Sequence, residues 1–132
     1  MIEIIEHTAD IGLKVKSSNL NEAFREAALG MMSLMVQMDK VDRKDELHIS
    51  ESSDSNESLL VRFLNDLLYH FEADNFVFSD VDISVKNYEL EAKLYGEKYD
   101  RARHGSKLLI KAVTYHMLKV DENGEIFVIF DI

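Results

Sequence analysis

A wide apolar stripe between residues 59 and 71 constrains the fold of this chain more than any other feature. Seven apolar side chains recur there at helical spacing: Leu59, Leu60, Phe63, Leu64, Leu67, Leu68 and Phe71. The spacing predicts an amphipathic helix whose broad apolar face packs flat on another apolar layer. The preceding Asp54-Ser-Asn-Glu57 resembles a capping box, so we expect the helix to begin there.

A further helix is predicted over residues 19–37. Asn19 and Glu22 have the spacing of a capping box, in which each side chain bonds the backbone N–H of the other residue. An apolar stripe follows, formed by Leu20, Ala23, Phe24, Ala27, Met31, Leu34 and Met35. Because the methionines follow helical spacing, we interpret them as core side chains and not as a soft metal site.

Alternating apolar and polar residues predict strands in much of the remaining chain. We expect strands at residues 1–7, 11–16, 41–51, 76–85, 88–94, 108–120 and 125–132. The Asn123-Gly124 pair is a strong hairpin signal and joins the last two strands. We interpret residues 7–12 as a turn and residues 96–105 as a surface loop.

These elements indicate an α+β fold, a two-layer sandwich in which two main helices pack on a mixed, largely antiparallel sheet. No internal repeat or long linker interrupts the chain, and proline is absent. The most loop-like stretch, residues 50–56, is too short to separate two domains. We therefore expect residues 1–132 to form a single domain.

Composition excludes several classes of function. The 25 acidic and 15 basic residues leave a net charge of −10, which repels phosphates, so we expect no autonomous binding to nucleic acid. Cysteine is absent, which excludes disulfides, zinc–thiolate sites and cysteine nucleophiles. No apolar run approaches the ~18 residues of a membrane span. The first residues lack the basic region of a signal peptide, so we expect a cytoplasmic protein.

Two aspartates and the end of the chain form the first candidate site. Asp10 follows the first predicted strand, and Asp131 precedes the C-terminal Ile132. If the terminal strands are neighbours, both side chains and the α-carboxylate of Ile132 converge, and a hard divalent cation compensates such oxygen ligands. The alternative is that Asp10 caps a turn while the last residues fray in solvent. The residues alone favour this alternative, because nothing local brings the two ends together.

The histidines form no recognisable metal motif, because no pair has the His-x-x-x-His spacing. We expect His70 and His116 to be hydrogen-bonded histidines within the fold. In the predicted loop, His104 forms a small cationic cluster with Arg101 and Arg103. Such a cluster suits a phosphate or an acidic partner, although loop charges are usually only solvated.

Motifs of self-contained catalysis are missing from the sequence. It has no Gly-x-Ser-x-Gly elbow, no P-loop and no Gly-x-Gly-x-x-Gly segment, and its five glycines are isolated. We therefore predict that this protein is not itself an enzyme.

Several segments, taken together and in this order, resemble the archease family. They are His7-Thr-Ala-Asp-Ile-Gly12, Leu59-Leu60 with Phe63-Leu-Asn-Asp-Leu-Leu-Tyr69, Gly96-Glu97, Ile110-Lys-Ala-Val-Thr-Tyr-His116 and Phe130-Asp-Ile132. The resemblance covers nearly the whole chain, and the terminal Asp-Ile is its most specific part. It also implies a fold similar to an α/β sandwich of a chaperone domain.

The resemblance implies an accessory protein of tRNA splicing and RNA repair. Archeases activate the RtcB-type RNA ligase, which uses GTP and a metal ion, by promoting guanylylation of the ligase's active-site histidine and multiple turnover. Carried over, the family's metal site falls on Asp10, Asp131 and Ile132. Calcium is the ion associated with such sites, and oxygen ligands also admit Mg²⁺ or Mn²⁺. The segment 97–104 is a second candidate for contact with the ligase.

Two functions from other classes remain open. A metal-dependent hydrolase requires a catalytic base beside the ion, and the sequence offers none apart from the ligands. A chaperone or general interaction module would suppress aggregation of unrelated proteins and leave turnover of the ligase unchanged.

Overall fold

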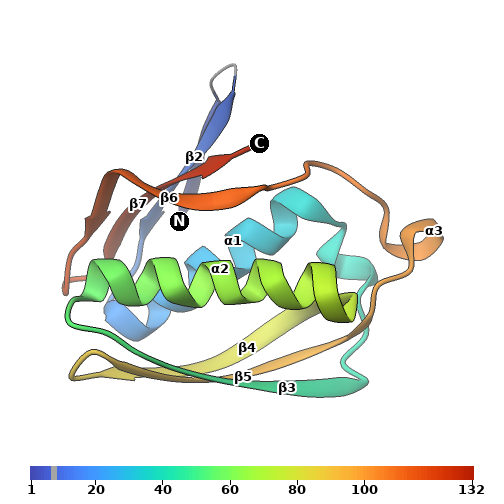
Figure 1. Cartoon of the computed structure of the whole chain (residues 1–132), viewed down its shortest axis with the longest axis horizontal. Coiled ribbons are helices and arrows are strands. Elements are labelled where there is room, and N and C mark those ends of the chain that lie inside the picture. The colour runs from blue at the N-terminus through green and yellow to red at the C-terminus, as the bar shows by residue number, and fades with distance from the viewer. Residues whose placement is uncertain (7–8) are drawn as a thin grey trace.

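The computed structural model describes residues 1–6 and 9–132 (Figure 1). The main helices are α1 (Leu20–Met35) and α2 (Asn56–Asp74), and two single-turn helices, η1 (Met38–Lys40) and α3 (Arg101–His104), lie in the connections. The strands are β1 (Ile2–Glu6), β2 (Asp10–Lys16), β3 (Asp45–Ser52), β4 (Phe76–Lys86), β5 (Glu89–Lys98), β6 (Ala112–Val120) and β7 (Glu125–Asp131).

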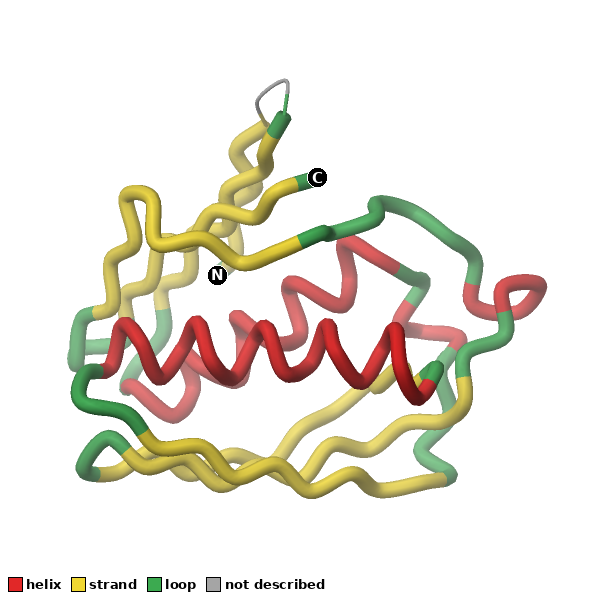
Figure 2. Tube along the Cα trace, in the orientation of Figure 1, coloured by secondary structure: helices red, strands yellow, loops and turns green. Residues whose placement is uncertain are grey.

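The strands form two antiparallel sheets, with strand orders β1-β2-β7-β6 and β3-β5-β4. Both main helices lie between the sheets, as Figure 2 shows in red between two yellow layers. The predicted α+β class and the two helices packed on antiparallel strands are confirmed. The structure differs in dividing the strands between two sheets, one on either side of the helices.

The two sheets follow from the residues on opposite sides of α1. On one side, Gly30 allows β2 to approach so closely that an added Cβ would lie 2.9 Å from the Leu13 Cδ2 atom. On the other side, the Arg25 guanidinium donates to the Val81 carbonyl oxygen at 3.2 Å and to Asp80 at 2.7 Å, both on β4. A helix that contacts both sheets cannot lie on the outside of a two-layer sandwich.

The Asn19 N-cap of α1 is confirmed, and the N-cap of α2 is shifted by one residue. The Asn19 side chain accepts a hydrogen bond from the Glu22 N–H at 2.9 Å. At α2 the N-cap is Ser55, whose Oγ accepts from the Ser58 N–H at 3.1 Å, and not Asp54. Aspartate and serine are equally good N-caps, so the sequence alone does not distinguish neighbouring candidates.

The end of the chain contains the predicted hairpin. Asp121 donates its N–H to the Glu125 carbonyl oxygen at 2.8 Å, and Gly124 has a φ of +103°, which favours glycine. His116, in contrast, is exposed and not enclosed by the fold. The reason is that β6 lies at the sheet edge and its register with β7 shifts between Thr114 and Lys119.

Two predicted connections are partly strands in the structure. Asp10–Gly12 of the expected turn 7–12 belongs to β2, because all three residues pair with β7, and Ile11 and Gly12 also pair with β1. His7 and Thr8, which begin the same motif, lie outside the described residues. Residues 96–98 of the expected surface loop continue β5. Within residues 1–6 and 9–132, no helix combines the length and the apolar character needed to cross a membrane.

Candidate functional site

Asp10 and Asp131 are direct partners in the register of β2 and β7. Residues directly opposite in an antiparallel pair point to the same face of the sheet, with Cβ atoms roughly 4.5–5.5 Å apart. Asp10 is half-buried and Asp131 is exposed. The last strand therefore lies beside β2, the second strand, and not beside β1, and this pairing brings the two carboxylates together.

Hydrogen bonds hold the end of the chain beside this pair. The Ile132 N–H donates to the Ala9 carbonyl oxygen at 3.3 Å, and the Lys111 N–H donates to the Asp131 carbonyl oxygen at 2.8 Å. The partly buried Ile132 side chain also packs against the hydrophobic core. The last two residues are thus fixed against β2 and the segment before β6, and they do not fray in solvent.

This arrangement offers oxygen ligands and a need for positive charge. Two like charges that face each other across a sheet are destabilising unless they are compensated. The α-carboxylate of Ile132 adds a third negative group to the same edge of the sheet. Among the described residues, no three Asp, Glu or His side chains come together as a metal site. The donor set at this edge therefore consists of two aspartates and a chain terminus, and its chemistry fits a hard divalent cation.

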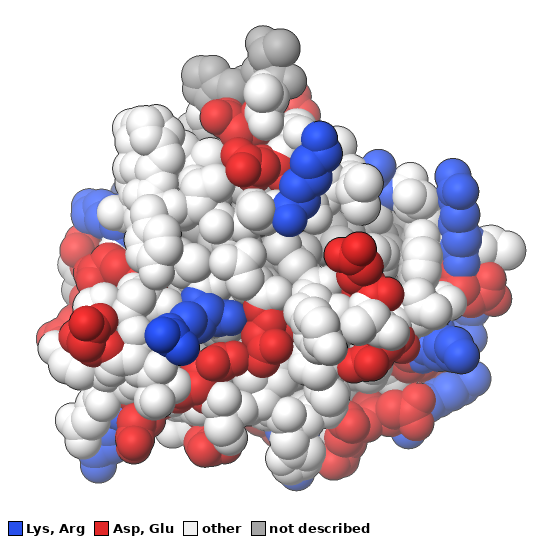
Figure 3. Space-filling view, in the orientation of Figure 1, with Lys and Arg blue, Asp and Glu red and all other residues white. Residues whose placement is uncertain are grey.

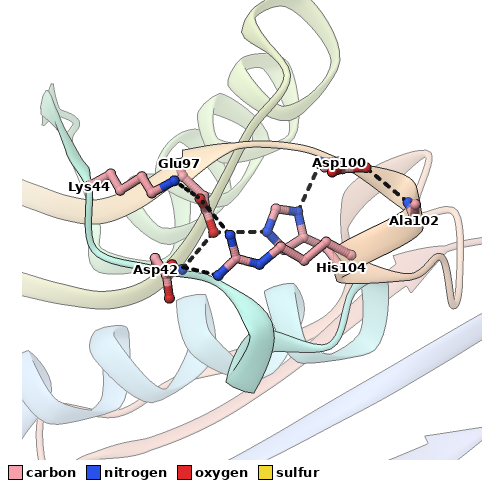
Figure 4. A network of polar contacts seen from close by, with 7 residues as sticks. Asp42, Lys44, Glu97, Asp100, Ala102 and His104 are labelled. Carbon is pink, nitrogen blue, oxygen red and sulfur yellow. Dashed lines mark hydrogen bonds and ion pairs between the residues drawn. The ribbon is translucent and has the colours of Figure 1, made fainter.

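A second polar site lies around Glu97, at the end of β5 (Figure 4). The Glu97 carboxylate accepts hydrogen bonds from the Asp42 N–H at 2.7 Å and from the His104 Nε2 at 3.0 Å. The Lys44 Nζ and Arg103 Nη1 atoms lie 3.6 and 3.5 Å from Glu97 Oε1. Glu97 and His104 are only 6% and 1% exposed, so this is a buried charged network and not a solvated loop.

Hydrogen bonds determine the charge state of Glu97 and the tautomer of His104. The Asp100 N–H donates to the His104 Nδ1 at 2.9 Å, so the ring proton lies on Nε2 and points at Glu97. The hydrogen bond from the Asp42 N–H, followed by that from His104 and the charge of Arg103, lowers the pKa of Glu97 from 4.5 to about 2. The Glu97 carboxylate is therefore ionised at neutral pH.

The Glu97 network joins segments that are distant in the sequence, and it holds α3 in place. Tyr99 stacks on the His104 ring with 5.9 Å between centroids, and its hydroxyl donates to the Gly105 carbonyl oxygen at 2.6 Å. Because Glu97 and His104 are buried and their polar side-chain atoms are hydrogen-bonded within the chain, the role of this pair is structural. The sequence pattern does not reveal this role and predicts that His104 belongs to an exposed cationic cluster; in the structure only the neighbouring Arg101 and Arg103 are exposed.

A third group of ionisable side chains lies between β3 and α2. Burial, together with the hydrogen bond and charge of Asp66, raises the pKa of Glu51 from 4.5 to about 7, and Arg62 opposes this shift. Further along α2, the His70 Nδ1 lies 2.6 Å from Asp74 Oδ2, so His70 is hydrogen-bonded as expected. No signal in the sequence links Glu51 to Asp66, because the contact joins two different elements.

The fold and the Asp10–Asp131 pair define a class of small α+β proteins: two helices lie between antiparallel sheets, and the pairing of β2 with the last strand places an aspartate opposite the penultimate residue. A family model described as the Archease protein family matches residues 2–132. The chain belongs to the archease family, as the resemblance of its motifs predicted.

Relatives from distant organisms match over most of their length. The protein archease of Sulfurisphaera tokodaii is 36% identical over 129 residues, which span 96% of this chain and 93% of that protein. The archease-like protein of Drosophila melanogaster is 33% identical over 139 residues, which span 98% and 89%.

Solved structures share the fold. The solution structure of protein 1598 of Methanobacterium thermoautotrophicum superposes with a TM-score of 0.76 at 30% identity and covers 99% of this chain and 98% of that one. A crystal structure from Thermotoga maritima, described as an archease and possible chaperone, superposes with a TM-score of 0.61 at 20% identity over 100% and 98%. At that identity the likeness concerns the fold alone.

Proposed function

We propose that this protein is a non-catalytic activator of an RtcB-type RNA ligase, acting in the cytoplasm in tRNA splicing and RNA repair. It promotes guanylylation of the ligase by GTP and allows multiple turnover. The observation that carries the proposal is the placement of Asp10 opposite Asp131, beside the C-terminus, in a chain that belongs to the archease family.

In this proposal, Asp10, Asp131 and the α-carboxylate of Ile132 hold a divalent cation, with calcium first and Mg²⁺ or Mn²⁺ as alternatives. A cation bound there supplies positive charge to phosphate groups during guanylyl transfer. The chain's own contribution is positional. Paired strands hold the two aspartates, and the bond from Ile132 to Ala9 keeps the chain end next to them.

Multiple-turnover RNA ligation tests the proposal directly. The cognate ligase is assayed with GTP and Mn²⁺, with and without substoichiometric amounts of this protein carrying a native C-terminus. We expect ligation to continue beyond one turnover only when the protein is present. Asp10→Ala and Asp131→Ala should each abolish the stimulation, whereas Glu122→Ala, at an exposed position in the β6–β7 hairpin, should not.

The ligation assay, together with two measurements on the purified protein, separates the proposal from its alternatives. Full stimulation by both aspartate variants would overturn the metal-based part of the proposal. Phosphoester turnover by the purified protein alone would favour a hydrolase. The Thermotoga maritima protein is described as a possible chaperone, which makes a chaperone the second candidate. That function predicts slower aggregation of an unrelated, heat-denatured protein and no effect on the ligase.

A further inference from the structure

The charge of this chain is distributed very unevenly. Two short segments, residues 37–44 and 98–107, contain seven of the fifteen basic residues and only three of the 25 acidic ones. These segments carry a net charge of +4, while the rest of the chain carries −14. We call the two segments together the basic end.

Tertiary contacts bring the two segments of the basic end together. The Gln37 N–H donates to the His104 carbonyl oxygen at 2.9 Å, and the Arg103 guanidinium pairs with the Asp42 carboxylate. Lys44 reaches Glu97, directly before the second segment, at 3.6 Å. Figure 3 shows Lys and Arg side chains along the edge of the molecule on which α3 lies, at the right of this view.

All seven cations of the basic end are exposed, but they differ in their partners. Arg43, Lys44 and Arg103 each form an ion pair with a carboxylate of the chain. Among the described residues, no carboxylate lies within ion-pair distance of the remaining four, which are Lys40, Lys98, Arg101 and Lys107. Of these four, Lys40, Lys98 and Arg101 are available to a partner, whereas Lys107 bonds a carbonyl oxygen of the chain.

Stabilisation of a helix C-terminus explains only one of the four cations without an ion pair. Lys107 donates from Nζ to the Ser33 carbonyl oxygen at 2.8 Å, in the last turn of α1, where a cation is favourable. Within residues 1–6 and 9–132, Lys98 and Arg101 make no such contact. Their backbone is nevertheless held firmly, because the buried pair of Glu97 and His104 fixes β5 and α3 on either side of them.

We propose that the basic end binds the phosphodiester backbone of the RNA while the ligase holds that RNA. The inference rests on the proposed function and adds a second partner to it. Exposed lysines and arginines on a fixed base neutralise phosphates and release their counterions. The remaining −14 opposes binding of RNA by this protein alone, so the contact forms only when the ligase supplies the RNA.

RNA fits the basic end better than an acidic protein face does. The available cations Lys40, Lys98 and Arg101 come from η1, β5 and α3, and thus are separate point charges on different elements. The regularly spaced phosphates of an RNA strand can pair with each of these cations, because a single phosphate contact requires no particular arrangement of the other cations. An acidic face of the ligase is the competing partner, and the experiment below separates the two.

The test compares two double variants with equal loss of charge. Lys98→Gln with Arg101→Gln removes two cations of the basic end and leaves the Glu97 network intact. Lys14→Gln with Lys86→Gln removes two exposed cations elsewhere and serves as the control. For each protein we would measure guanylylation of the ligase by GTP without RNA, and the apparent KM for RNA in ligation over a series of KCl concentrations.

We expect the basic-end variant to stimulate guanylylation as the wild type does, to raise the KM for RNA, and to reduce the slope of log KM against log salt by about 1.4 for two lost contacts with single-stranded RNA. The control should match the wild type in all three. An unchanged KM and salt slope in the basic-end variant would overturn the inference. A loss of guanylylation as large as the effect on ligation would also overturn it, because it indicates that the basic end contacts the ligase itself. If the wild type stimulates neither reaction, the proposed function fails first.

Discussion

Asp10 and Asp131 stand near opposite ends of the chain, yet they lie directly opposite each other on neighbouring antiparallel strands. Side chains in such positions are close enough for like charges to cost roughly 0.2–1 kcal/mol. The pair is therefore unfavourable on its own, and a cation bound there would relieve the repulsion. The stability of the protein in the presence and absence of a divalent cation thus tests the proposed metal site.

We predict that Asp10→Asn abolishes stabilisation by calcium. At a free Ca²⁺ concentration 100 times its Kd, binding should stabilise the wild type by about 2.7 kcal/mol. In EDTA, the variant should be as stable as the wild type or up to about 1 kcal/mol more stable, because the repulsion is removed. Thermal unfolding with Ca²⁺ and with EDTA measures both effects.

The control for this prediction is Glu122→Gln, which removes an equal charge from an exposed position remote from the pair. It should retain the full response to Ca²⁺. Equal stabilisation of the wild type and of Asp10→Asn by Ca²⁺ would contradict a site built on Asp10.

We predict that Glu97→Gln strongly destabilises the fold. The Asp42 N–H and the His104 Nε2 both bond Oε2, and an amide oxygen there could still accept from them. The amide NH₂ group, however, replaces Oε1 beside Lys44 and Arg103, so these two cations lose their buried counter-charge. We expect the Tm to fall by about 10 °C at pH 7. Calorimetry measures the change, and a Tm within about 2 °C of the wild type would show that the network is dispensable.

We predict that protonation of Glu97 contributes to the loss of wild-type stability at low pH. The pKa of Glu97 is lowered to about 2 in the folded chain, from an ordinary value of 4.5. Between these values the unfolded chain binds more protons, so this contribution is complete above pH 4.5 and is lost as the pH falls toward 2. Urea midpoints between pH 2 and 6 should therefore fall more steeply for the wild type than for Glu97→Gln.

Glu51→Gln should have the opposite dependence on pH. The pKa of Glu51 is raised to about 7, so the folded chain binds more protons than the unfolded chain between pH 4.5 and 7. Wild-type stability due to this group thus decreases as the pH rises through that window. We expect the variant to be more stable by about 1 kcal/mol at pH 8, after allowance for solvent screening, and equal at pH 4.

Urea unfolding at pH 4 and pH 8 tests this prediction. Glu89→Gln, an exposed glutamate on the neighbouring β5, serves as the control and should change stability equally at both values. A gain at pH 4 equal to that at pH 8 would mean that deprotonation of Glu51 does not cause the effect.

We predict that Gly96→Ala destabilises the protein by about 3 kcal/mol or more. A Cβ at this position would overlap the Val77 carbonyl oxygen and approach Phe78 Cα to 2.7 Å, and these atoms belong to the backbone of β4 and cannot move aside cheaply. Lys98→Ala, exposed on the same strand, should stay within about 0.5 kcal/mol of the wild type. Urea unfolding of both variants provides the comparison.

Tertiary pairing accounts for the sequence-based predictions that were wrong or incomplete. The alternation of apolar residues ends near Leu94, so the sequence predicts a surface loop over residues 96–105. In the structure Glu97 points inward, because His104 and the Asp42 N–H satisfy it there. From the sequence, a buried carboxylate cannot be distinguished from one on the surface, because only the tertiary structure brings its hydrogen-bond partners close to it.

The sequence by itself determined what depends on neighbouring residues: the two main helices, the Asn19 cap and the hairpin at Asn123 and Gly124. Their causes are helical spacing, capping and turn chemistry, which act over a few positions. Only the tertiary structure decided that β2 pairs with β7 and that the helices lie between two sheets. Strand pairing is a contact over a long separation, and its register is selected by the burial of whole faces.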